Sequence, residues 1–122
     1  MDIEKIEAGG TSVAIIRGSG IVIEDVQSAL DLMATVRFET GCDRMVIGKS
    51  LICEDFFNLK TRLAGDILQK FVNYQVKLAI AGDFSQYSSQ SLQDFMRECN
   101  KGKDIFFLPD EQTAIEKLSV SN

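Results

Sequence analysis

The sequence predicts an α/β protein, a single domain with a mixed, mostly parallel sheet of five to six strands and about four helices. From residue 25 onward, helix-like and strand-like segments alternate, which requires crossover connections between parallel strands. Before residue 18, two strand-like segments flank Gly9-Gly10, a dipeptide typical of tight hairpin turns, and these predict an antiparallel pair. The chain of 122 residues is 45% hydrophobic, enough for one core, and no linker-like segment divides it.

The first third is expected to hold the hairpin and a helix. Strands are predicted at 3–8 and 11–17, followed by a glycine-rich turn and a short strand at 21–23. A helix is predicted from about Asp25 to Thr40, because acidic residues suit its positive end and Gly41 ends it. Its buried stripe is expected to comprise Val26, Ala29, Leu30, Met33 and Val36.

The middle third is expected to contain a strand and the longest helix. A buried strand is predicted at 44–48, a loop at 49–53, a first turn at 54–57 and the helix at 59–74. Leu68 is expected at the centre of the buried stripe of that helix. Gly65 lies between its two faces, where a glycine costs about 1 kcal/mol relative to alanine, so we expect close packing to explain it.

The last third repeats the alternation. A strand at 76–81 leads through Gly82-Asp83 and a serine-rich loop to a helix that Ser88 or Ser89 can cap and Gly102 ends. A strand at 104–108 follows, and Pro109-Asp110 opens a final short helix. A disordered tail is expected from about residue 119.

Composition excludes several kinds of chemistry. The chain has no histidine, which excludes Ser-His-Asp and Cys-His catalysis and histidine-based metal sites, so no cofactor or metal is predicted. The net charge of −5 disfavours a nucleic-acid partner. A membrane span is not predicted, since no apolar run approaches about 18 residues. Cys42, Cys53 and Cys99 lack any paired spacing and predict free thiols in a cytoplasmic protein.

Five segments carry a resemblance to a known family. They read DVQSALDLM at 25–33, ETGCDR at 39–44, EDFF at 54–57, LAGDILQKF at 63–71 and AGDFS at 81–85. Together they resemble the uncharacterised bacterial domain-of-unknown-function family 4180, over residues 11 to 118. The resemblance implies no particular activity.

The order of elements resembles, more loosely, the sulfate-transporter and anti-sigma-factor-antagonist (STAS) domain. That resemblance implies a protein-binding, regulatory domain. The phosphorylatable serine of STAS domains follows a central strand in an Asp-Ser-Ser/Thr-Gly context, and this chain has no such motif. The nearest hydroxyls belong to Ser50 and Thr61, and the sequence leaves open whether either is phosphorylated.

Polar residues follow two neighbouring strands of the predicted sheet. The predicted ligand-binding residues are Lys49, Ser50, Glu54, Asp55 and Asp83. They are expected at the carboxyl edge of the sheet, where open α/β sheets bind ligands, and could hold an anion or Mg²⁺ or act as acid and base. The structural alternative is that the acids suit a helix start and cap a turn, while the lysine is solvated.

Surplus aromatic residues point to another class of function. Phe38 falls on the polar side of its helix, and Phe56 and Phe57 are consecutive, so one narrow stripe cannot bury both. Exposed aromatic residues in a patch mark protein interfaces, and these three are the predicted interface residues. The leading hypothesis is therefore a protein interaction domain, with a homodimer as one form that the interaction could take. The alternative is a ligand-binding protein or an enzyme with its site at the sheet edge.

Overall fold

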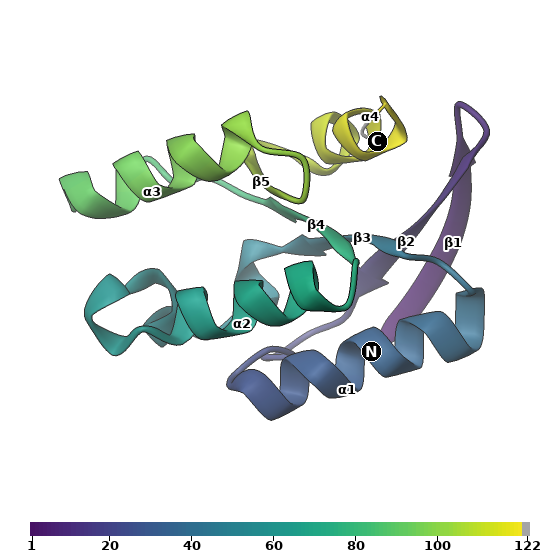
Figure 1. Ribbon diagram of the computed structural model, residues 1–122, viewed down its shortest axis with the longest axis horizontal. Coiled ribbons are helices and arrows are strands. Elements are labelled where there is room, and N and C mark those ends of the chain that lie inside the picture. The colour runs from purple at the N-terminus through teal and green to yellow at the C-terminus, as the bar shows by residue number, and fades with distance from the viewer. Residues whose placement is uncertain (121–122) are drawn as a thin grey trace.

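The computed structural model describes residues 1–120, which form one five-stranded sheet with helices on both faces (Figure 1). The strands are β1 (Asp2–Ala8), β2 (Thr11–Arg17), β3 (Arg44–Gly48), β4 (Lys77–Ala81) and β5 (Ile105–Leu108). The α-helices are α1 (Val26–Thr40), α2 (Leu63–Asn73), α3 (Gln90–Lys101) and α4 (Glu111–Val120). Short 3-10 turns, η1 (Lys49–Leu51), η2 (Glu54–Phe57) and η3 (Leu59–Thr61), connect β3 to α2.

The sheet is mixed and its strands follow one another in chain order, β1-β2-β3-β4-β5. The hairpin β1-β2 is antiparallel, and Gly9 and Gly10 take φ angles of 58° and 81°, which side chains disfavour and glycine adopts readily. The pairs β2-β3, β3-β4 and β4-β5 are all parallel. These observations confirm the predicted α/β class, the amino-terminal hairpin and the mostly parallel sheet.

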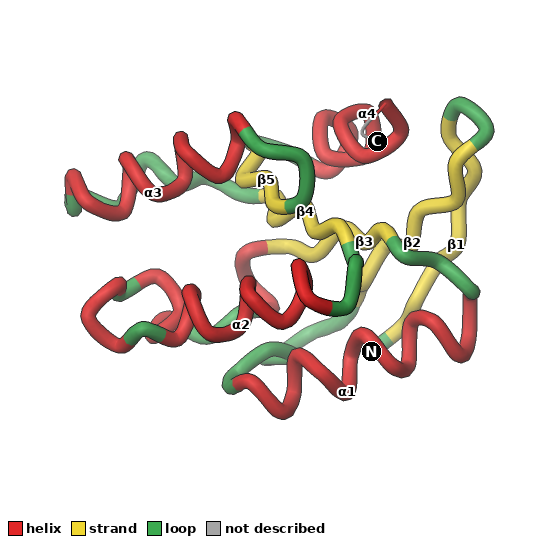
Figure 2. The backbone as a smooth tube through the Cα atoms, in the orientation of Figure 1, coloured by secondary structure: helices red, strands yellow, loops and turns green. Residues whose placement is uncertain are grey.

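Two layers of helices cover the two faces of the sheet. One cluster of buried residues joins Ala14, Met45 and Leu78 to the inner sides of α1, α2 and α3. Alternate residues of the same strands, among them Val13 and Val46, pack instead against α4 on the opposite face. Figure 2 shows α1 and α2 on one side of the line of strands and α4 on the other. Within residues 1–120, no helix is long and apolar enough to cross a membrane.

Three element boundaries differ from the sequence predictions. Residues 21–23 do not form a sheet strand; Ile23 makes one isolated parallel bridge with Ile52. The helix predicted at 59–74 begins at Leu63, because Arg62 takes a left-handed conformation (φ 64°) that interrupts the helical path. With 11 residues, α2 is shorter than α1, which has 15. α4 continues to Val120, whereas residues 121–122 lie outside the described residues.

Burial corrects two expectations about the helices. The inner side of α1 includes Leu32, which the predicted stripe omitted, and leaves Val26 and Leu30 only half-buried. Gly65 is exposed, and a Cβ placed there would have no neighbour within 4 Å. Close packing therefore does not explain this glycine. Leu68 is buried on the inner side of α2, as predicted.

Candidate functional site

The first candidate region is the carboxyl edge of β3 and β4. Lys49 follows β3 directly, and Asp83 lies two residues after the end of β4. The two strands are parallel neighbours, so both residues come to the same edge. A Cβ added at Gly82 would lie 2.7 Å from the Cβ of Lys49, which shows how closely the two segments approach each other.

A residue that the sequence analysis did not name, Tyr87, joins this region. The Lys49 ammonium lies 5.1 Å from the centre of the Tyr87 ring, within range of a cation-π interaction. The Tyr87 hydroxyl lies 3.4 Å from a carboxylate oxygen of Glu54. Burial, together with the nearby Glu54 carboxylate, raises the pKa of the Tyr87 hydroxyl to about 12. The Tyr87 hydroxyl thus keeps its proton to higher pH than an ordinary tyrosine, and it donates that proton in a hydrogen bond to Glu54.

The five predicted ligand-binding residues are only partly brought together. Asp83 accepts hydrogen bonds from the backbone amide and the hydroxyl of Ser85, and these bonds hold the pKa of its carboxyl below the usual value, with a smaller contribution from Lys49. Ser50 and Asp55 are exposed. Within residues 1–120, no group of three metal-binding side chains is found. The Asp83 carboxylate thus forms its hydrogen bonds within its own loop.

An aromatic cluster covers this edge of the sheet. Phe57 stacks on Tyr87, with ring centres 5.1 Å apart, and also contacts Phe56 and Phe84. Phe84 in turn meets Phe107 of β5 edge-on. Phe56 and Phe57 are 1% and 5% exposed, so the prediction that these two residues belong to an exposed interface patch is wrong. They are not on one helical stripe: η2 is a short turn that places both rings against the end of the sheet.

The topology leaves no crevice beneath that cluster. Ligands of open α/β sheets bind where neighbouring strands send their helices to opposite faces. Here the helices that follow β2, β3 and β4 all pack in the same layer. The chain changes face only after β5, an outer strand. Hollows of about 300 and 540 Å³ lie between η3 and the start of α3, with Asn58 and Ser89 on both, and Phe57 and Tyr87 line the smaller one.

The second candidate region is the outer face of α1. Phe38 is 91% exposed, the most exposed large apolar side chain in residues 1–120. Ala34, one turn earlier, is exposed as well, and Leu30, another turn earlier, is half-buried. The three residues recur at steps of four, so they form an apolar line along the helix. The sequence shows this spacing, but the predicted buried stripe included Leu30, so the apolar line was not predicted.

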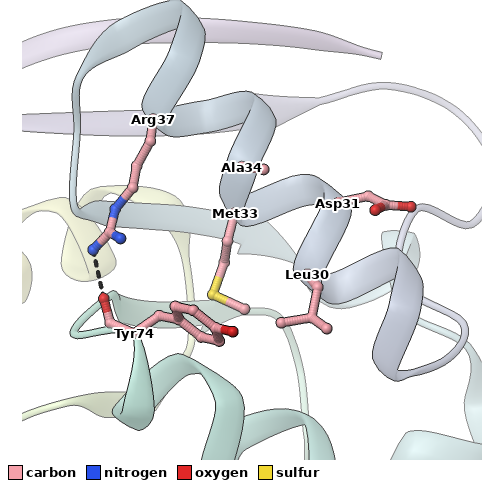
Figure 3. Close-up of a pocket in the computed structure, with 6 residues that line it drawn as sticks. All are labelled: Leu30, Asp31, Met33, Ala34, Arg37 and Tyr74. Carbon is pink, nitrogen blue, oxygen red and sulfur yellow. Dashed lines mark hydrogen bonds between the residues drawn. The ribbon is translucent and has the colours of Figure 1, made fainter.

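A groove borders this line where α1 meets the end of α2. Leu30, Met33 and Tyr74 turn toward one another across it (Figure 3), and its volume is about 470 Å³. The Arg37 guanidinium donates a 2.5 Å hydrogen bond to the Tyr74 carbonyl oxygen, which ties the two helices together at one end. Tyr74 is 53% exposed and follows α2 directly, whereas the sequence analysis placed it as the last residue of the predicted helix and did not single it out.

A second hollow lies on the other side of the same line. Its volume is about 190 Å³, and Asp31 stands on its rim. The residues lining it are Met1, Val22, Ser28, Asp31, Leu32 and Thr35. Phe38 therefore lies on a face of α1 that is bordered by two depressions, and Leu30 and Ala34 line the larger of them. A protein surface could engage it with side chains on both sides.

Comparisons with known proteins give one match. Residues 8–118 match the model of a family described as a domain of unknown function (DUF4180). No curated protein and no solved structure matches the chain.

Proposed function

This chain belongs to the DUF4180 family, whose function is unknown, and from that premise we propose that it is a protein interaction domain that binds through the outer face of α1. One observation carries the proposal: Phe38 is 91% exposed, at the end of an apolar line whose other members, Leu30 and Ala34, line a groove. Burial of one such side chain contributes about 1.5–3 kcal/mol, and aromatic anchors beside pockets commonly dominate binding energy.

The surroundings of Phe38 suit a protein partner better than a small molecule. The Phe38 ring is 91% exposed and no wall encloses it, while a small ligand needs a concave site that encloses most of its surface. Asp31 and Arg37 flank the apolar line with opposite charges. An apolar centre with a polar rim is the usual anatomy of a protein interface.

The proposed role is that of a regulatory, STAS-like interaction domain in the bacterial cytoplasm. The element order supports it, since two strands are followed by alternating helices and strands that end in a helix. The three free thiols support the reducing compartment. The proposal does not include a phosphorylation switch, because the serine motif of STAS domains is missing from the loop after β3.

Site-specific photocrosslinking in the native cell tests this proposal. A photoreactive phenylalanine derivative replaces Gln27, which is exposed on the outer side of α1, and the matched control replaces Gln112 on α4. We expect a discrete protein adduct from position 27, none from position 112, and at least a fivefold smaller yield when Phe38→Ala is added. Equal yields from the two positions, or an adduct insensitive to Phe38→Ala, would contradict the proposal.

The alternative function is binding of a small anion at the carboxyl edge of β3 and β4. The observation in its favour is Lys49, whose ammonium lies at that edge, 5.1 Å from the centre of the Tyr87 ring. A thermal-shift screen of phosphate, nucleotides, carboxylic acids and divalent ions tests it. A stabilisation that disappears in Lys49→Met but persists in Lys60→Met would support this site over the interface on α1.

A further inference from the structure

We propose that β1 pairs with β1 of a second copy of this chain, antiparallel and about a two-fold axis at Ile6, so that two five-stranded sheets become one continuous sheet. The strand lies at an edge of the sheet, and its charges and backbone groups fit a second copy in one register. This surface is different from the outer face of α1, and the inference does not depend on the function proposed for that face.

β1 is an open edge of the sheet. It comes first in the strand order and pairs only with β2, and Figure 1 shows it as the outermost strand beside β2. All seven of its residues pair with β2 without a bulge, so its outer side is a regular row of amide and carbonyl groups. At the opposite edge, Asn100 bonds the outward-facing groups of Phe107. Within residues 1–120, the hydrogen bonds that other side chains make to β1 go to the carboxylates of Glu4 and Glu7 and not to its backbone.

The hairpin turn decides which backbone groups of β1 point outward. The two glycines of the turn both have positive φ, and in such a two-residue turn the flanking pair, here Ala8 and Thr11, exchanges hydrogen bonds. Hydrogen-bonded pairs alternate along an antiparallel ladder, so every second residue before Ala8 also bonds to β2. The residues between them direct their amides and carbonyls away from β2; they are Ile3, Lys5 and Glu7.

Symmetry limits the registers in which two such strands can pair. A two-fold axis perpendicular to the sheet leaves each side chain on its own face, and directly opposed residues share a face, so one residue must lie opposite its own copy. Registers centred on Glu4, Lys5 or Glu7 set two like charges directly opposite each other, which destabilises a strand pair. Registers centred on Ile3 or on an end residue pair three residues of each strand or fewer. A register centred on Ile6 pairs residues 4–8 of each strand and opposes no like charges.

The register centred on Ile6 pairs opposite charges. Lys5 of one copy lies opposite Glu7 of the other, and the two-fold axis forms this contact twice. Within residues 1–120, Lys5 is exposed and makes no ion pair, and the Glu7 carboxylate accepts hydrogen bonds only from the hydroxyl of Ser12. A carboxylate has further lone pairs with which to accept an ammonium group. Because Lys5 and Glu7 also direct their backbone groups outward, each such pair exchanges backbone hydrogen bonds as well.

The axis joins apolar side chains of the two copies. Ile6 is half-buried and packs against the cluster that includes Val13 and Leu118, on the α4 face of the sheet. In the proposed register the two Ile6 side chains meet at a non-hydrogen-bonded position, where the Cα atoms of an antiparallel pair are about 4.5 Å apart. Each side chain therefore covers part of the other. Charged residues on edge strands commonly prevent unspecific pairing, and here the same charges select one register.

Sedimentation velocity over a concentration series tests the charge pairing. Wild-type protein should shift from monomer to dimer with a dissociation constant of about micromolar order, because an interface built on one strand of each copy is small. Lys5→Glu and Glu7→Lys change the net charge in opposite directions, yet each should weaken the dimer at least tenfold, because each creates two like-charge contacts. The double variant Lys5→Glu/Glu7→Lys restores both ion pairs and should return to within about threefold of wild type.

The matched control is Lys60→Glu, the same charge reversal at an exposed residue of η3, which should leave the dimer unchanged. Circular dichroism checks that each variant is folded. Wild-type protein that stays monomeric at every concentration overturns the proposal. So does a double variant that remains as weak as the two single variants.

Disulfide trapping tests the register. In a background that keeps only the buried Cys42, with the other two cysteines replaced by serine, Ile6→Cys should form a covalent dimer under mild oxidation. The expected Cα separation of about 4.5 Å lies within the range of disulfides. Glu4→Cys, on the same face of β1, should not be trapped, since its own copy lies four residues further along the partner strand, about 14 Å away. Trapping of Lys5→Cys in place of Ile6→Cys would show the register centred on Lys5 and overturn the one with paired charges.

This inference and the function proposed for α1 can fail separately. Lys5→Glu changes the sheet edge and not α1, so it should leave the photocrosslinked adduct from position 27 in place. A monomeric protein that still gives that adduct overturns the second-copy inference alone. A dimer that is trapped through Ile6→Cys, without any adduct from position 27, supports this inference and contradicts the interaction function of the α1 face.

Discussion

The side-chain amide of Asn100 in α3 makes two hydrogen bonds to the backbone of Phe107 in β5. Its amide nitrogen donates to the Phe107 carbonyl oxygen at 3.0 Å, and its amide oxygen accepts from the Phe107 amide at 2.7 Å. In a parallel strand the amide and carbonyl of one residue point the same way, and those of Phe107 point away from β4. The side chain of Asn100 thus makes the two hydrogen bonds that a neighbouring strand would make with Phe107 at this edge of the sheet.

Asn100→Ala should lower the free energy of unfolding by about 1–3 kcal/mol, because it leaves a backbone amide and carbonyl of a buried residue without partners. Asn100→Asp keeps the acceptor and loses the donor, so it should fall between the alanine variant and wild type. Urea denaturation measures all three. If the alanine variant matched wild type, water would have to replace both bonds, and Asn100 would not protect this edge.

Gly65→Ala should stabilise the protein by about 0.5–1 kcal/mol. The residue lies inside α2, it is exposed, and a methyl group there meets nothing within 4 Å. Alanine restricts the unfolded chain and is the better helix former, so the gain comes without a steric cost. The measurement is the urea midpoint at an unchanged slope. A loss of stability would mean that the outer side of α2 is covered by something in solution.

Gly82→Ala should have the opposite effect, with a loss of about 1–3 kcal/mol. Its Cβ would lie 2.7 Å from the Cβ of Lys49, so one of the two backbone segments must move. That movement also shifts Lys49 relative to the Tyr87 ring, which ultraviolet difference spectra of the tyrosine can detect. Gly65→Ala and Gly82→Ala make the same replacement, each at an ordinary φ. The difference between their stabilities therefore separates the effect of backbone preference from that of close packing.

Leu68→Ala should cost about 2–5 kcal/mol. Leu68 is buried on the inner side of α2, in the same cluster as the strands β3 and β4, so its truncation removes apolar contacts and leaves a cavity. Gln69→Ala, at the next, exposed position, should change stability by less than about 0.5 kcal/mol. Equal effects at the two positions would show that the inner face of the helix has been misassigned.

Helix ends were predictable because their signals are local. Asp25 begins α1 by accepting a hydrogen bond from the amide of Ser28, and Gly41 ends it with a φ of 72°. Ser89 begins α3 in the same way, through the amide of Leu92. Each of these contacts spans three or four residues, so the residue types that make them can be recognised without knowing the fold.

The path from β3 to α2 could not be predicted, because distant contacts determine it. Phe57 packs against rings that come from the loop after β4, Phe56 packs against Phe57, and no helical period describes two adjacent buried rings. Arg62 adopts a left-handed conformation where the sequence favours a continuous helix. The site residue Tyr87 was missed for the same reason, since its partners Lys49 and Glu54 lie more than 30 residues away.

The pH dependence of stability provides a last prediction, centred on Asp110 at the start of α4. Its carboxylate accepts a 2.7 Å hydrogen bond from the Thr113 amide, and hydrogen bonding to Thr113 holds the pKa of this carboxyl below its ordinary value of 3.8. A carboxyl whose pKa is lower in the folded state stabilises the fold above the unfolded-state pKa and loses that contribution as the pH falls through the folded-state pKa.

Asp110→Asn should therefore reduce the acid-induced fall in stability below about pH 5, while costing little at neutral pH, because asparagine caps a helix nearly as well as aspartate. Asp110→Ala should lower stability at neutral pH as well, because the cap itself is lost. Urea denaturation at pH 7 and at steps between pH 5 and pH 3 distinguishes the two effects. If Asp110→Asn retained the full acid-induced fall, the fall would have to arise at other carboxyls with lowered pKa values, Asp83 and Asp94 among them.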